Sequence, residues 1–460
     1  MIQIYNSLTS KKEPFQPIHP GKVKMYVCGV TVYDFCHLGH ARTYVAFDVI
    51  NRYLMWRGFE VTYVRNITDI DDKIIHRANE NNEPFMNVVD RNILAMHEDF
   101  KALNLLEPTY APRATEYIPQ MISLIEKLID KDYAYIADNG DVYYEVRKFK
   151  HYGELSHRDL DKLESGARVE IVDVKRDPLD FVLWKLAKPG EPSWDSPWGK
   201  GRPGWHTECS VMSMDLLGVH FDLHGGGKDL IFPHHENELA QSEAVSCNKF
   251  VNTWMHAGFL QINKEKMSKS LGNFFTIRDI LKEYHPEIVR YFLITSHYRS
   301  QLSFSDEGLN LASNALERLY TALRDFPQAN AAQGTDFEKK FIEAMDDDFN
   351  TPIAFSILFE LAHEVQRMRA EDKDKAAAYA ALLKRLGGIL GILQMDAEKF
   401  FQRNADKLDV AKIEALIEER NKARTNKNWA TADRVRKELS AMSIVLEDSE
   451  KGTTWKLVRH

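Results

Sequence analysis

Cysteine is scarce in this sequence, which has four cysteines in 460 residues, at Cys28, Cys36, Cys209 and Cys247. Four thiols are too few for a disulfide scaffold in a chain of this length, so we expect reduced thiols or metal ligands. No apolar run approaches the ~18–20 residues that a membrane-spanning helix needs. The first residues, MIQIYNSLTSKKEPF, also lack the continuous apolar stretch of a signal peptide. These absences predict a cytoplasmic protein with no membrane partner.

Glycine and proline are also infrequent, with 23 Gly and 16 Pro, whereas 44% of the residues are hydrophobic. This composition excludes collagen-like and disordered chains. The net charge of −8 argues against a protein that coats DNA, although it is compatible with local basic surfaces. At ~100–200 residues per domain, the length predicts two to four domains.

Two stretches of the chain have an α/β pattern. Residues 22–66 contain a strand-like run, a helical rhythm and a second strand, which predicts a right-handed βαβ crossover. Residues 205–270 return to this alternation. The residues between them, above all about 110–200, are less regular and indicate an insertion. The Asn139–Gly140 turn within it predicts a β-hairpin.

From about residue 276 onward the pattern is almost purely helical, with no clear strand before the last fifteen residues. The apolar positions Leu358, Leu361, Val365 and Met368 have the spacing of a buried helix face and indicate a helical bundle. The sequence therefore predicts an α/β core followed by a helical C-terminal region.

The sequence HLGH, from His37 to His40, follows the first predicted strand at the start of the first predicted helix. Nucleotides bind at this point in doubly wound sheets, between the carboxyl end of a strand and the amino end of a helix. Gly39 leaves room for a flat base against the backbone, and the two histidines can donate hydrogen bonds to phosphate oxygens. Alone, the motif is more typical of helix caps or surface histidines.

The sequence KMSKS, from Lys266 to Ser270, supplies two lysines and two hydroxyls shortly before a glycine. Such a segment can form a flexible cationic clamp for phosphates. By itself it is also typical of a solvated charged loop. HLGH after the first strand and KMSKS after a later strand of the same α/β layer are specific in combination.

This combination resembles the class I aminoacyl-tRNA synthetases and, in detail, the cysteinyl-tRNA synthetase family. The resemblance continues through NITDIDDKI, GDVYYEV, RPGWHTECS, HGGGKDLIFPHHENE, HYRSQLSFS and DDDFNTP, and covers essentially the whole chain. It implies a Rossmann-type parallel-sheet catalytic core with a connective insertion, followed by an all-helical C-terminal region. The implied domains are a catalytic domain at 1–275, with its insertion at about 110–200, a stem-contact-like region at 276–330, a helical bundle at 331–404 and a small basic anticodon-binding domain at 405–460.

The resemblance also implies a ligase that activates L-cysteine with ATP and Mg²⁺ and transfers it to tRNA(Cys). We expect a monomer. Such a reaction needs positioning and charge stabilisation rather than a side-chain nucleophile. The residues implied to stabilise phosphoryl charge are His37, His40, Lys266 and Lys269. The residues implied to bind ATP are His37, Gly39, His40, Lys266, Ser268 and Lys269. The candidate contacts of the amino acid are Thr31, Thr68 and Trp205.

A candidate metal site combines residues from distant parts of the chain. His234 and Glu238 are four residues apart on a predicted helix and project from one face of it. Cys209 lies on another predicted helix and Cys28 on the first strand. Such donors suit tetrahedral zinc, but spacing alone leaves open two buried free cysteines beside a surface histidine. The resemblance implies one zinc per chain, because all four positions match the family's ligands.

Zinc would explain how such an enzyme selects cysteine. Serine and alanine have nearly its shape, and apolar contact discriminates by only ~1–3 kcal/mol per small group. Zinc prefers thiolate and lowers the pKa of a thiol by coordination. His235 and Glu236 are candidate partners of the ligands, whereas Cys36 and Cys247 match no ligand position.

Residues 420–437 hold seven Lys or Arg and one Asp in an otherwise acidic chain. No Pro or Gly interrupts them, which predicts a helix–turn–helix with a basic face. The closing GTTWKLV predicts a final strand with an exposed Trp455. Cations and aromatics suit the phosphates and unpaired bases of an anticodon loop, and a solvated charged helix is the alternative. The expected tRNA contacts are Arg420, Lys422, Arg424, Lys427, Trp429, Arg434, Arg436, Lys437 and Trp455.

Two other functions share some of these motifs. A cysteine ligase that joins cysteine to an amino sugar, of the mycothiol type, resembles the same core and zinc site. A non-catalytic tRNA-binding relative is the other alternative. Intact HLGH and KMSKS argue against the second, and the basic C-terminal region argues against the first, which has no use for it.

Overall fold

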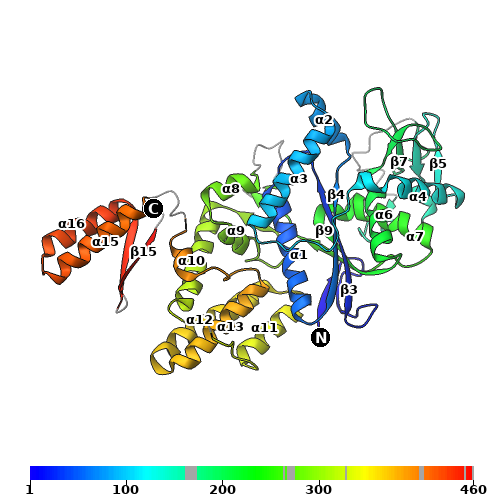
Figure 1. Ribbon diagram of the computed structural model, residues 1–460. Coiled ribbons are helices and arrows are strands. Elements are labelled where there is room, and N and C mark those ends of the chain that lie inside the picture. The colour runs from blue at the N-terminus through cyan, green and yellow to red at the C-terminus, as the bar shows by residue number, and fades with distance from the viewer. Residues whose placement is uncertain are drawn as a thin grey trace.

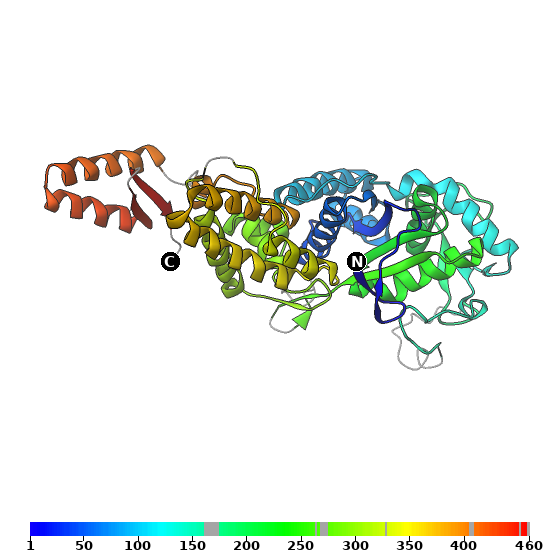
Figure 2. The same cartoon turned by 90° about the horizontal axis from the view of Figure 1, so that it is seen from below.

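The computed structural model describes residues 1–160, 174–262, 265–266, 275–326, 329–403, 409–449 and 452–457. The described chain is elongated, with a parallel sheet near one end and a small C-terminal module at the other (Figures 1 and 2). None of its helices combines the length and apolar character that crossing a membrane requires.

A parallel sheet of four strands lies at the centre of the described N-terminal half, in the order β10-β9-β3-β4. These strands are β3 (Lys22–Thr31), β4 (Glu60–Thr68), β9 (Phe221–Gly227) and β10 (Val251–Ala257). The crossover predicted over residues 22–66 is confirmed, since β3 and β4 pair in parallel and α1 (Leu38–Trp56) joins them. β4 lies on one side of β3, whereas β9 and β10 lie on the other side. The strand order therefore reverses at β3, and the carboxyl ends of β3 and β9 flank this switch point of the topology.

Helices cover both faces of this sheet, and the alternation along β3 shows why. Met25 and Val27 point into one hydrophobic cluster, and Tyr26 and Cys28 point into the other. The first cluster includes α1 and α3 (Phe85–Ala102) and continues into the bundle. The second includes α4, α6 and α7 and continues into the insertion. The bounds of these helices and of α2 are Asp72–Asn81 (α2), Ile118–Asp130 (α4), Trp205–Leu217 (α6) and Glu236–Ser246 (α7).

The insertion contains an antiparallel sheet in the order β5-β6-β7-β8. The predicted hairpin is confirmed, because β5 and β6 pair on either side of a turn in which Gly140 has φ +84°. The strands are β5 (Ala134–Ile136), β6 (Val142–Tyr144), β7 (Phe181–Leu186) and β8 (Gly201–Pro203), and a separate hairpin near the N-terminus pairs β1 (Gln3–Asn6) with β2 (Lys11–Pro14).

The C-terminal half is helical, and Leu358, Leu361, Val365 and Met368 are buried in its core as predicted. Its helices up to residue 401 are α8 (Ile277–Glu283), α9 (Pro286–Leu293), α10 (Asp306–Leu323), α11 (Asp336–Asp346), α12 (Thr351–Glu371), α13 (Lys373–Ile389) and α14 (Ala397–Phe401). One short strand, β13 (Leu302–Phe304), lies within this region. It pairs with β11 (Leu260–Ile262), which also pairs with β12 (Glu265–Lys266).

The C-terminal module has its own small core. The predicted helix–turn–helix is present as α15 (Val410–Thr425) and α16 (Trp429–Ala441), followed by a hairpin of β14 (Ile444–Ser449) and β15 (Gly452–Leu457). The buried residues of this core are Ile413, Leu416, Ile417, Val435, Leu439, Ile444 and Trp455. Arg324 joins the module to the bundle through Glu447 and Thr454.

Candidate functional site

A pocket of about 260 Å³ opens where β3 ends and α1 begins. The predicted site residues that line it are Cys28, Thr31, His37, Gly39, His40 and Trp205. Gly227 ends β9 and Asp229 follows it on one wall, and Gly258 and Leu260 follow β10 on another. Open α/β sheets bind ligands at this position, outside the carboxyl ends of the strands at a switch point.

The two histidines of HLGH cap α1 and line the pocket at the same time. His37 Nδ1 accepts a hydrogen bond from the backbone N–H of His40 at 3.2 Å, and His40 Nδ1 accepts from His37 N–H at 3.3 Å. Their rings stack with centroids 3.6 Å apart. Because Nδ1 is the acceptor in both rings, each neutral ring carries its proton on Nε2, which leaves two ring N–H donors among the pocket residues.

KMSKS begins beside the pocket wall. Lys266 pairs with Gln261 of β11, the residue after the pocket-lining Leu260. The rest of the motif, including Ser268 and Lys269, lies outside the described residues, so their contacts with ATP stay predictions.

The four predicted metal ligands converge from four elements. Cys28 is on β3, Cys209 is on α6, His234 is in the helical turn η4 (Ile231–His235), and Glu238 is in the first turn of α7. Their ligand atoms lie within 4.8 Å of one another. The Sγ atoms of Cys28 and Cys209 are 3.6 Å apart, and His234 Nε2 lies 2.8 Å from Glu238 Oε1. All four side chains are buried. Two thiols, an imidazole and a carboxylate in one buried cluster fit the donor preferences of zinc.

The charges in this cluster also favour a cation. Burial would lower the pKa of His234, but Glu238 and Cys209 raise it to about 10. Burial would raise the pKa of Glu238, but His224 and His234 hold it well below its usual range. Hydrogen bonds from Cys28 and His234 similarly outweigh burial and lower the pKa of the Cys209 thiol. The cluster therefore favours the ionised forms of Glu238 and Cys209, whereas burial, with Cys209 and Glu238 beside it, raises the pKa of the Cys28 thiol well above its usual range. A metal ion would require both thiols to be deprotonated.

Further histidines contact the predicted ligands, and no clear sequence signal points to most of them. His224 Nε2 lies 2.8 Å from Glu238 Oε2, and His235 Nε2 lies 3.3 Å from Cys28 Sγ. His206 Nδ1 lies 2.9 Å from His234 Nδ1. His235 is thus a ligand partner as expected. Glu236 is not, because its carboxylate accepts hydrogen bonds from the N–H groups of Gly153 and Ser156 instead.

The three candidate contacts of the amino acid have different surroundings. Trp205 is 37% exposed and stacks on His234 with ring centroids 4.1 Å apart, so it joins the pocket to the ligand cluster. Thr31 lines the pocket. Thr68 is not among the lining residues, because its buried hydroxyl donates to Glu208 Oε2 at 2.9 Å. The prediction that Thr68 faces the amino acid is therefore not supported by its position.

Two of the predicted tRNA contacts have structural roles instead. Trp455 is 2% exposed and donates its indole N–H to Glu414, so the prediction of an exposed Trp455 was wrong. The pattern GTTWKLV shows a strand but not which face of it is covered. Arg420 is 8% exposed and binds both carboxylate oxygens of Asp448, at 2.9 and 2.7 Å, which removes it from a free basic face.

The other basic residues of this stretch are exposed, but three of them have acidic partners. Arg424 binds Asp448, Lys422 binds Glu418, and Arg434 binds Glu419 and Glu438. The exposed basic residues of the module that make no ion pair with any described residue are Lys427, Arg436 and Lys437. Trp429, at the start of α16, is 61% exposed.

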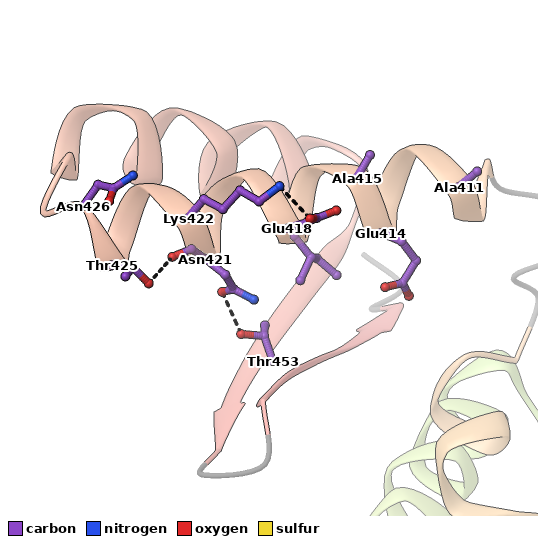
Figure 3. A pocket seen from close by; sticks show the side chains of 10 residues that line it. Ala411, Glu414, Ala415, Glu418, Asn421, Lys422, Thr425, Asn426 and Thr453 are labelled. Carbon is purple, nitrogen blue, oxygen red and sulfur yellow. Dashed lines mark hydrogen bonds and ion pairs between the residues drawn. The ribbon is translucent and has the colours of Figure 1, made fainter.

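An open hollow of about 770 Å³ lies between α15 and the tip of the hairpin (Figure 3). Glu414, Glu418, Lys422 and Thr453 are among its lining residues, and Lys422 is paired with Glu418. With two carboxylates against one paired lysine, this hollow does not offer the positive charge that phosphates need.

Family models match three successive parts of the chain. Residues 14–314 match the class I (C) tRNA synthetase catalytic domain, residues 340–394 match the DALR domain, and residues 410–455 match the cysteinyl-tRNA ligase anticodon binding domain. Similar curated proteins named cysteine–tRNA ligase come from Haemophilus influenzae, with 60% identity, and from Pasteurella multocida, with 59% identity. Each comparison covers 99% of this chain and 100% of the relative.

The chain belongs to the cysteine–tRNA ligase family. It is thus a class I aminoacyl-tRNA synthetase, as the resemblance implied. The amino-sugar ligase alternative is not supported, because an anticodon-binding domain model matches the C-terminal module and the curated ligases match over their full length.

Solved structures agree on the fold. A Mycobacterium tuberculosis methionyl-tRNA synthetase in complex with methionyl-adenylate is similar with a TM-score of 0.56 at 15% identity, covering 83% of this chain and 91% of that one. A LeuRS from Agrobacterium radiobacter K84, in a ternary complex with tRNA, is similar with a TM-score of 0.60 at 11% identity, covering 84% and 86%. Both place the Rossmann-type core and the helices that follow it in the class I fold.

Proposed function

We propose that the chain activates L-cysteine with ATP to cysteinyl-adenylate and then transfers the cysteinyl group to the 3′-terminal adenosine of tRNA(Cys), as a cytoplasmic monomer in protein biosynthesis. One observation carries this proposal beyond family membership. Cys28 belongs both to the buried metal-type cluster and to the lining of the HLGH pocket. A set of side chains that suits a thiol-selective metal ion therefore lies next to the pocket expected to bind the nucleotide.

Cys28, Cys209, His234 and Glu238 would hold one zinc ion. Zinc, when bound, would supply a Lewis acid that prefers a thiolate over the hydroxyl of serine. Trp205 closes this side of the pocket by stacking on His234. His224 orients Glu238 from the other carboxylate oxygen, as partners of metal ligands commonly do.

Activation is an attack of the cysteine carboxylate on the α-phosphorus of ATP, with pyrophosphate as the leaving group. His37 and His40 would donate their Nε2–H groups to phosphate oxygens, with Gly39 beside the nucleotide. Lys266, Ser268 and Lys269 would also bind the phosphates, with Mg²⁺ on the phosphates. These residues position the reactants and offset charge in the transition state.

Transfer requires the tRNA to span the molecule from the pocket to the C-terminal module. The second step is expected to use the 2′-hydroxyl of the terminal adenosine as the nucleophile. We assign catalysis to residues 1–275, stem contact to 276–330, the bundle to 331–404 and anticodon binding to 405–460. Lys427, Arg436, Lys437 and Trp429 support the last assignment, because they combine an exposed ring with cations that make no ion pair with the described residues.

Amino-acid-dependent pyrophosphate exchange, run with each of the twenty amino acids, tests the first step. Exchange is expected with cysteine, with serine and alanine near background. Charging of tRNA(Cys) transcripts tests the second step. Exchange with another amino acid in preference to cysteine would contradict the proposal, as would activation of cysteine without any charging of tRNA(Cys).

A further inference from the structure

Arg42 lies on α1, two residues after His40, and is 1% exposed. It forms no ion pair with a carboxylate among the described residues. Its two terminal nitrogens donate instead to backbone carbonyls at the end of α9 and in the segment that follows it. These carbonyls belong to Leu293, Ser296, His297, Tyr298 and Ser300. The hydroxyl of Ser296 accepts a further bond at 3.1 Å.

This cage of carbonyls fixes the segment to α1. A buried guanidinium is costly unless its N–H groups are bonded, and its bonds to carbonyls are charge-assisted. Burial lowers the pKa of Arg42 to about 10, so the side chain stays a cation at neutral pH. Lysine could not reproduce the cage, because an ammonium lacks the planar fork of donors.

The same segment supports the far wall of the pocket. Tyr298 O, which accepts from Arg42 at 3.3 Å, also accepts from the N–H of Gly258 at 2.8 Å. Leu302 N–H then donates to Phe259 O at 2.9 Å, and β13 continues in parallel with β11. Gly258, Phe259 and Leu260 line the pocket, and β11 leads to β12 and Lys266. The Tyr298 carbonyl thus links α1, which begins at HLGH, to the pocket wall from which β11 and β12 lead to Lys266.

A second buried arginine provides a natural comparison. Arg290 on α9 binds Asp48 of α1, the carbonyls of Leu103 and Asn104, and Leu390 O at 2.9 Å. It therefore also joins α1 to its neighbours, but none of its partners is among the residues that line the pocket.

We propose that Arg42 is a positioning residue for adenylate formation, which sets the HLGH end of α1 against the Gly258–Leu260 wall and the strand of Lys266. The inference rests on the proposed phosphate-binding role of HLGH and KMSKS. Cysteine would be selected on β3, α6 and α7, outside this contact. Losing Arg42 should therefore affect the rate of the chemical step more than the binding of cysteine.

Two substitutions probe the contact from its two sides in the full-length enzyme. Arg42→Lys keeps the charge and removes the fork of donors. Gly258→Ala keeps the guanidinium but places a Cβ 2.3 Å from Ser300 O, so it displaces the segment rather than filling the pocket. In cysteine-dependent pyrophosphate exchange, both variants should lose about 10²-fold in kcat, as small misplacements do. The KM for cysteine should stay within about threefold.

Arg290→Lys is the matched control. It should lower the thermal unfolding midpoint at least as much as Arg42→Lys, while kcat stays within about threefold of the parent. The proposal is overturned if Gly258→Ala keeps its kcat, and this variant decides alone should Arg42→Lys not fold. It is also overturned if Arg290→Lys loses kcat in the same proportion, because the loss would then reflect general destabilisation.

His40→Ala and Lys269→Ala separate this inference from the proposed function. If they lose adenylation while Gly258→Ala retains it, only the positioning role fails. If they retain adenylation, the phosphate-binding role of the two motifs fails first, and the positioning role with it.

Discussion

Cys28 and Glu238, which are 210 residues apart in the chain, place a sulfur and a carboxylate oxygen 3.3 Å from each other. The contact joins the end of β3 to the start of α7 across the second core cluster. The packing of helices on the parallel sheet thus brings the predicted metal ligands together, and a bound ion would stabilise this packing.

Cys209→Ser should release zinc and reduce the preference for cysteine over serine. A serine hydroxyl is a much poorer zinc ligand than a thiolate, so the metal content of the purified variant should fall well below one ion per chain. Metal analysis by mass spectrometry measures this loss, and exchange with cysteine and serine measures selectivity. Cys247→Ser is the control, because Cys247 is exposed and lies outside the cluster. Full zinc content together with full selectivity in Cys209→Ser would contradict the assignment.

Lys269→Ala should slow cysteinyl-adenylate formation by about 10²–10³-fold, because its charge is needed most where negative charge develops on pyrophosphate. The binding of cysteine should change much less. Single-turnover adenylate formation measures the effect, with Lys249→Ala, a surface lysine, as control. An unchanged rate with a raised KM for cysteine would place Lys269 in amino acid binding instead.

Much of this architecture could be predicted, because period-two and helical patterns and two motifs identify the sheet, α1 and the pocket. The histidines that contact the predicted metal ligands, above all His224, could not be predicted. His224 reaches Glu238 only because β9 pairs beside β3, and nothing local in HFDLHGGG distinguishes it from a core residue. Trp455 and Arg420 show the same limit on the surface. Composition gives the charge and aromatic content of a segment, but burial depends on which face the hairpin and α15 present to each other.

Asp48→Asn should lower the free energy of unfolding by about 3–5 kcal/mol at pH 7, because it leaves the buried Arg290 without its partner. Burial alone would raise the pKa of Asp48, but Arg290 and Arg52 outweigh it and lower the pKa. The Asp48 contribution is therefore present above the unfolded-state pKa of about 3.9 and is lost as pH falls through the folded-state value.

Urea unfolding of the parent and of Asp48→Asn at several pH values tests this. The difference between them should be largest at neutral pH and should shrink as pH falls below about 4. Glu60→Gln is the comparison, because the Glu60–Lys22 pair is exposed and should contribute about 0–1 kcal/mol. Equal effects of the two substitutions at pH 7 would show that the buried pair contributes no more to the free energy of unfolding than the exposed pair.

Trp429→Ala should weaken tRNA binding, whereas Trp455→Ala should lower the stability of the C-terminal module. Trp455 fills the core of the C-terminal module, so its loss should destabilise the module by about 3–5 kcal/mol. Trp429 is largely exposed, so its loss should leave stability nearly unchanged and weaken tRNA(Cys) binding by about 1–3 kcal/mol, as expected for a stacked base. Thermal unfolding and filter binding measure the two effects. Unaltered tRNA affinity in Trp429→Ala would remove this ring from the interface.

Deleting residues 405–460 should separate the two steps of the reaction. The module has its own core, and its described side-chain hydrogen bonds and ion pairs to the bundle are made by Arg324, so the remaining chain should fold without it. The adenylation pocket lies before residue 275, so cysteine-dependent pyrophosphate exchange should stay close to that of the full chain. Charging of tRNA(Cys) should fall sharply, and the salt dependence of tRNA affinity should weaken because cations that meet phosphates are removed.

A full-length variant with Lys427, Arg436 and Lys437 replaced by alanine should also lose tRNA(Cys) charging, but to a smaller extent. If the truncated chain charges tRNA as well as the full chain, the module does not read the anticodon.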